Sequence, residues 1–195
     1  MEEGGKIVIS PEKAIIETAY NAYARSLYTF ARHLGFDRET SLDCIQDVFC
    51  SVIEHKDNLN EINDVRVYLF CSLKNRLVNV YKMRRPMWEA RTSEAAGELP
   101  FTTGVTIEDE IIGKEEDEDL RRRVEAMLRK LPRRQREVIW LRYMQDMDYP
   151  QIAEVMNITV PQSHSLLHRA ISNLRKNETD MGLFSFFLYL TLFRI

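Results

Sequence analysis

The sequence predicts an all-α protein made of two small helical domains that an acidic linker joins. Apolar residues recur every three or four positions in several long segments, whereas glycine (7) and proline (6) are scarce among the 195 residues. Between these segments lies a stretch rich in acids, glycine and proline, which is typical of a linker. We therefore expect domains at 8–85 and 119–178, the linker at 86–118 and an apolar tail at 179–195.

Three helices are expected in the first domain because their ends carry recognisable capping residues. Ser10 caps the first helix and Gly35 ends it, since glycine readily adopts the left-handed conformation that follows many helices. Asp37 opens the second helix and Asp64 caps the third. Pro86 is expected to stop the third helix at the preceding residue, because proline disfavours a helical backbone there.

The second domain is expected to end in a helix-turn-helix. Helical periodicity covers 120–131 and returns after a proline, and a short helix follows at 150–156. Asn157 tolerates the left-handed conformation of a tight turn, and Thr159 can cap the next helix, which runs to about Arg175. Apolar residues on both helices are spaced to pack the pair together.

Charge is distributed unevenly along the chain although the net charge is only −3. Residues 86–120 hold 2 basic and 11 acidic side chains, whereas residues 121–195 hold 13 basic and 7 acidic ones. The stretch 66–85 contains no acid and these cations: Arg66, Lys74, Arg76, Lys82, Arg84 and Arg85. Two basic surfaces beside an acidic segment favour nucleic-acid contacts. The alternative is that the cations only solvate helix faces.

No enzyme, cofactor or metal site is expected. The sequence has no phosphate-binding glycine loop, metal-ligand cluster or nucleophile motif. His164 and His168 stand four residues apart, but no third ligand accompanies them. Three cysteines without a CxxC pair, Cys44, Cys50 and Cys71, favour reduced thiols and a cytoplasmic chain.

The second helix of the helix-turn-helix has an apolar and a polar side. Glutamine and arginine can make paired hydrogen bonds to base edges, and serine can reach a base or a phosphate. The polar side and its flanks carry Gln162, His164, Ser165, His168, Arg169 and Ser172. This pattern favours DNA binding, and the alternative is a helical hairpin that binds nothing.

Residues 131–175 resemble the promoter-reading C-terminal domain of bacterial sigma factors of the extracytoplasmic-function class. The resemblance rests on Leu131-Pro132, Val138-Ile139-Trp140-Leu141-Arg142, Ile152-Ala153-Glu154 and His168-Arg169-Ala170. It implies that this domain reads the −35 promoter element and docks on the flap of the polymerase β subunit. The implied contact residues are Arg142, Gln162, His164, Ser165, His168 and Arg169. His164 departs from the family, which usually has lysine or arginine there.

The segment 43–49 resembles the helix with which these factors bind the clamp helices of the polymerase β′ subunit. The implied contact residues are Asp43, Gln46, Asp47 and Phe49. Alternatively, this is a solvated face above a packed core to which Phe49 belongs.

The segment 68–85 resembles the helix that reads and opens the −10 element. Opening DNA needs cations for the backbone and a pocket or aromatic face for unstacked bases. Tyr81 is the candidate aromatic face and the connector 56–64 is the candidate pocket loop. The implied contact residues are Lys74, Asn75, Arg76, Asn79, Tyr81, Lys82, Arg84 and Arg85.

The sequence is therefore interpreted as a non-enzymatic sigma factor that binds core RNA polymerase and directs initiation at promoters by recognising both elements and helping to melt the DNA. A conventional helix-turn-helix regulator is the alternative, but it would not need the segments 43–49 and 68–85. Family members are commonly held by an anti-sigma factor, which is a further expected partner.

The tail Met181–Ile195 is strongly apolar and lies outside the family pattern. Its apolar run 183–193 is too short for the roughly 20 residues that span a bilayer, so no membrane span is expected. Packing on the chain's own domains, a partner contact and a membrane-surface contact all stay open, and one hypothesis is that the tail clamps the two domains together.

Overall fold

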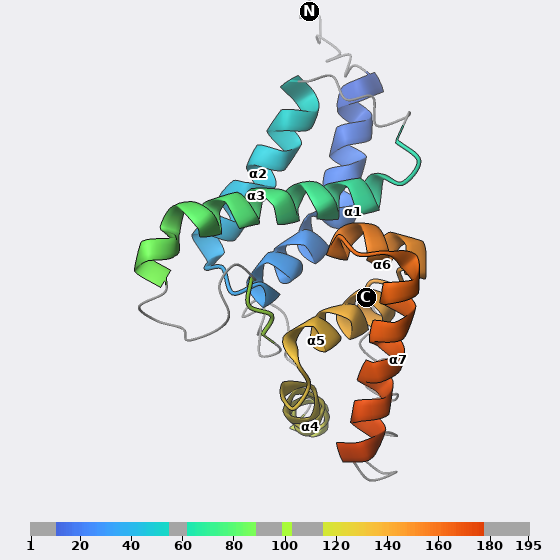
Figure 1. Ribbon diagram of the computed structural model, residues 1–195. Helices are drawn as coiled ribbons and strands as arrows, with labels where there is room; N and C mark the ends of the chain where they lie inside the picture. Colours follow the sequence, from blue (N-terminus) through green and yellow to red (C-terminus); the bar gives the residue numbers. More distant parts are fainter. Residues whose placement is uncertain (1–10, 55–61, 89–98, 103–114, 178–195) are drawn as a thin grey trace, which may run out of the picture.

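A computed structural model of the protein describes residues 11–54, 62–88, 99–102 and 115–177 (Figure 1). The described residues form helices joined by turns and loops and contain no strand, which confirms the all-α prediction. The elements are α1 (Pro11–His33), α2 (Arg38–Glu54), α3 (Val65–Trp88), α4 (Glu115–Arg129), α5 (Arg133–Ile139), the π-helical turn η1 (Trp140–Met144), α6 (Tyr149–Met156) and α7 (Val160–Asn177). Within the described part of the chain, no helix is long and apolar enough to cross a bilayer. The tail and the residue Ser10 lie outside it.

The predicted caps shape the first domain, in which α1, α2 and α3 pack on one another. Gly35 has a φ of +85° after α1, as a C-terminal cap requires. The Asp37 carboxylate accepts a hydrogen bond from the Thr40 amide at 2.8 Å at the start of α2. Asp64 accepts one from the Val67 amide at 3.0 Å at the start of α3.

The helix α3 continues to Trp88, so the predicted stop at Pro86 is wrong by three residues. A proline in the last turn of a helix this long removes only one backbone hydrogen bond. The carbonyl groups of a last turn have no partner within the helix in any case. The steric preference of the residue before proline is therefore overridden here.

The helix-turn-helix of α6 and α7 is confirmed. Asp148 and Gln151 form a capping box at the start of α6, with each side chain bonded to the other's backbone amide. Asn157 has a φ of +51°, in the left-handed region that the tight turn demands. Thr159 and Gln162 repeat the box at the start of α7, where the Gln162 side chain accepts from the Thr159 amide at 2.9 Å.

The two domains share one hydrophobic core, which the sequence pattern did not predict. We use the name interdomain core for the ring cluster formed by Phe30 and Phe70 of the first domain, Trp140 of the second and Phe101 between them. The Trp140 ring stacks on Phe30 with centroids 5.4 Å apart and lies 6.2 Å from Phe70 and 6.3 Å from Phe101. All four side chains are buried.

Polar contacts reinforce this arrangement. Lys74 of α3 donates to Glu137 of α5 at 2.6 Å, and Gln151 of α6 donates to Asp64 at the start of α3. Figure 1 shows the N-terminal part of α3 above α6, and the two helices are in contact. The linker residues 99–102 are fastened to the end of α1, because the Thr102 amide donates to the His33 carbonyl at 2.7 Å and the His33 ring bonds the Thr102 carbonyl.

Candidate nucleic-acid and polymerase interfaces

The predicted reading side of α7 is exposed. Four apolar side chains of this helix, Leu166, Leu167, Ala170 and Leu174, are buried. The five predicted contact residues on the same helix, Gln162, His164, Ser165, His168 and Arg169, are all exposed. The helix therefore presents donors and acceptors of the kinds that recognise base edges.

A stack of side chains lies beside this face. The rings of Tyr149 and His164 are stacked with centroids 4.0 Å apart and planes 24° from parallel. The Arg142 guanidinium also lies over the Tyr149 ring, 5.6 Å from its centroid, and donates to the Met147 carbonyl at 2.8 Å. Sequence reasoning selected Arg142 and His164 but missed Tyr149, because a tyrosine at a helix start carries no signal of which rings it meets.

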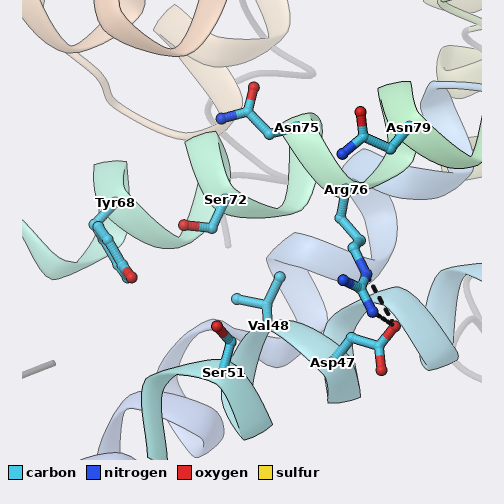
Figure 2. A pocket seen from close by; sticks show the side chains of 8 residues that line it. All are labelled: Asp47, Val48, Ser51, Tyr68, Ser72, Asn75, Arg76 and Asn79. Carbon is cyan, nitrogen blue, oxygen red and sulfur yellow. Dashed lines mark hydrogen bonds and ion pairs between the residues drawn. The ribbon is translucent and has the colours of Figure 1, made fainter. Parts of the chain in front are cut away.

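A groove of about 210 Å³ lies between α2 and α3 (Figure 2). It is lined by Asp47, Val48, Ser51, Tyr68, Ser72, Asn75, Arg76 and Asn79. Three of these, Asn75, Arg76 and Asn79, belong to the predicted −10 residues, and Asp47 belongs to the predicted polymerase-binding residues. Arg76 forms a two-pronged contact with the Asp47 carboxylate, with its Nε atom 3.0 Å from one oxygen. One predicted DNA contact and one predicted polymerase contact thus pair with each other.

Other predicted −10 residues have varied surroundings. Lys82 is exposed, and the Arg84 guanidinium donates to the Thr40 hydroxyl at 3.0 Å. Lys74 is held by Glu137. The side chain of Arg85 lies outside the described residues, as does most of the predicted pocket loop, at 55–61.

Two predicted aromatic contacts are buried. Tyr81 is 9% exposed and follows the buried Leu73 and Leu77 at intervals of four, which places it on the inner side of α3. Phe49 is 5% exposed and packs edge-on against Tyr20, with centroids 5.1 Å apart. The Tyr81 ring therefore does not face solvent in this structure. Phe49 occupies the core position that the alternative interpretation gave it.

The polar residues of the predicted polymerase-binding face are more accessible. Asp43 and Gln46 are exposed on α2, and Asp47 is half-buried. Cys44 lies beneath them, and burial raises the pKa of its thiol. Burial also raises the pKa of Cys71 to about 11, so both thiols stay protonated at neutral pH. Within the described residues, no three His, Cys, Asp or Glu side chains gather as a metal site would require.

Comparisons with known proteins agree with these two domains. The family Sigma-70 region 2 matches residues 19–86, and the family Sigma-70 region 4 matches residues 121–174. RNA polymerase sigma factor YlaC of Bacillus subtilis (strain 168) is 26% identical over 164 residues, which are 84% of this chain and 92% of that protein. ECF RNA polymerase sigma factor SigM of the same organism is 21% identical over 169 residues, which are 82% of this chain and 93% of that protein.

Two solved structures share the fold. The sigma factor RpoE in complex with the anti-sigma factor NepR from Bartonella quintana has a TM-score of 0.59 and 18% identity, covering 83% of this chain and 95% of that one. CnrH in complex with the cytosolic domain of CnrY has a TM-score of 0.53 and 21% identity, covering 85% and 88%. Both family matches, in this order, and the full-length relatives lead to one conclusion: the chain belongs to the Sigma-70 family of RNA polymerase sigma factors, in its extracytoplasmic-function class.

Proposed function

We propose that this sigma factor, which binds core RNA polymerase and directs transcription initiation, uses α2 to contact polymerase, α7 to read the −35 element and the groove between α2 and α3 to hold a base of the −10 element. The observation that carries this proposal is the exposed polar side of α7 on a helix-turn-helix whose apolar side is fully packed. The exposure of Asp43 and Gln46 supports the polymerase contact.

At the −35 element, Gln162 and Arg169 are the side chains best suited to base edges. In the free protein each makes one local contact: Gln162 in its capping box and Arg169 to the Ser165 carbonyl at 3.3 Å. Both side chains are exposed, so their remaining donors and acceptors are accessible. Arg142 adds a cation at the edge of this surface.

At the −10 element, the groove offers volume and polarity together. Its 210 Å³ is about seven times the share of one water molecule in the liquid, so it admits a group much larger than water. Asn75 and Asn79 line the groove with amide donors and acceptors, and Tyr68 lines its other end, beyond Ser72. Unstacking a base costs a few kcal/mol, which such contacts can offset.

The domain boundaries, the cytoplasmic location and an anti-sigma partner stay predictions of the sequence. The alternative function, a regulator that acts without core polymerase, is not favoured because the first domain belongs to the Sigma-70 region 2 family.

In vitro transcription tests the proposal. The purified chain is mixed with core polymerase that lacks its own sigma subunit, and start sites on genomic fragments are mapped. We expect defined start sites, which Arg169→Ala and Asn75→Ala weaken at the −35 and −10 elements respectively. Arg129→Ala is the matched control, since this exposed arginine pairs with Glu125 within its own helix. Failure of the chain to bind core polymerase would refute the proposal.

A further inference from the structure

The stack of Arg142, Tyr149 and His164 joins three separate elements: η1, α6 and α7. Tyr149 is the only one of the three that is not itself a predicted DNA contact. We propose that Tyr149 is a positioning residue for −35 recognition, and that it makes His164 a determinant of base preference. This inference rests on the proposed function of α7.

The backbone around Tyr149 is fixed on both sides. The residue before it, Asp148, is the N-cap of α6. The backbone carbonyl of Tyr149 accepts a hydrogen bond from the buried Ser163 hydroxyl at 3.1 Å. The ring is therefore held by α6 and α7 together, and the exposed His164 ring lies flat against it. Stacked aromatic rings are worth about 0.5–1.5 kcal/mol beyond the area they bury.

This geometry changes what His164 can do. A stacked imidazole has lost most of its rotational freedom before DNA arrives, so fixing it on a base edge costs less entropy. The ring nitrogens of an imidazole can hydrogen-bond a base edge, whereas a flexible lysine or arginine side chain would favour any phosphate. His164 is thus suited to direct readout at one position of the −35 element.

The test uses the holoenzyme of this chain with core polymerase and a promoter library randomised over the −35 element. Tyr149→Leu removes the ring, Tyr149→Phe keeps it and His164→Ala removes its partner. We expect Tyr149→Leu and His164→Ala to lose base preference at the same position by about tenfold, since one base contact is worth about 1–3 kcal/mol. Tyr149→Phe should retain the preference, and the double variant should lose no more than either single one.

A merely structural role predicts a different result. In that case Tyr149→Leu weakens binding uniformly at every position of the element and His164→Ala changes no preference, and either outcome overturns the inference. A wild-type holoenzyme that selects no −35 sequence at all would instead show that the proposed function is wrong.

Discussion

Replacement of Trp140 should uncouple the two domains. Its side chain is 8% exposed and stacks on Phe30, so Trp140→Ala removes the central ring of the interdomain core. Loss of a buried tryptophan costs about 3–5 kcal/mol, because the lost contacts and the remaining cavity both contribute. With a urea dependence of about 2 kcal/mol per molar, the midpoint of the first unfolding step should fall by about 1.5–2.5 M below that of wild type.

Urea unfolding followed by far-ultraviolet circular dichroism checks this. Wild type should unfold in a single transition because the core is continuous across the domains. In Trp140→Ala the second domain should unfold first and separately. The chain has two tryptophans, so fluorescence of the variant reports Trp88 of α3 alone.

Met83→Ala is the control, since that side chain is 84% exposed and its loss should change stability by less than about 0.5 kcal/mol. A midpoint of Trp140→Ala equal to that of the control would refute the shared core as a source of stability.

Three further predictions concern single positions. Burial lowers the pKa of His33 to about 4 from an ordinary 6.5, so between these values the unfolded chain binds a proton that the folded chain excludes. The free energy of unfolding should therefore fall by roughly 3 kcal/mol as the pH drops from 6.5 to 4. His33→Gln should lose this dependence in urea titrations at different pH. Gly35→Ala should destabilise the fold by more than about 1 kcal/mol, because its φ is +85° and a β-carbon would lie 2.7 Å from Pro100; an unchanged melting temperature would contradict this. Asp148→Ala should cost about 1 kcal/mol through loss of the capping box, whereas Asp148→Asn should keep most of that stability in the same thermal assay.

Sequence reasoning succeeded where a signal is local. Asp37, Asp64 and Asn157 act within three or four residues of their own position, so their roles as caps follow from residue type alone. The exposed side of α7 likewise follows from helical spacing, since its apolar residues had to face the core.

Contacts between distant segments were not predictable in the same way. Periodicity indicates that Trp140 is buried but not that it packs against Phe30, which lies in another domain. Lys74 and Glu137 are 63 positions apart, and each has the composition of an ordinary helix surface. The burial of Tyr81 was not predictable either, because an aromatic residue within a basic helix fits a base contact and a core position equally well until the packing is known.

The fastening of residues 99–102 to the end of α1 sets how far the second domain can travel. While Thr102 stays bonded to His33, the 12 residues between Thr102 and Glu115 limit the distance between these two points to at most about 43 Å, at 3.6 Å for each residue. Without the bonds between His33 and Thr102, the 26 residues between Trp88 and Glu115 limit the distance between those two residues to at most about 94 Å. The hydrogen bonds between His33 and Thr102 therefore reduce by more than half the greatest separation that the chain length allows between the first domain and α4.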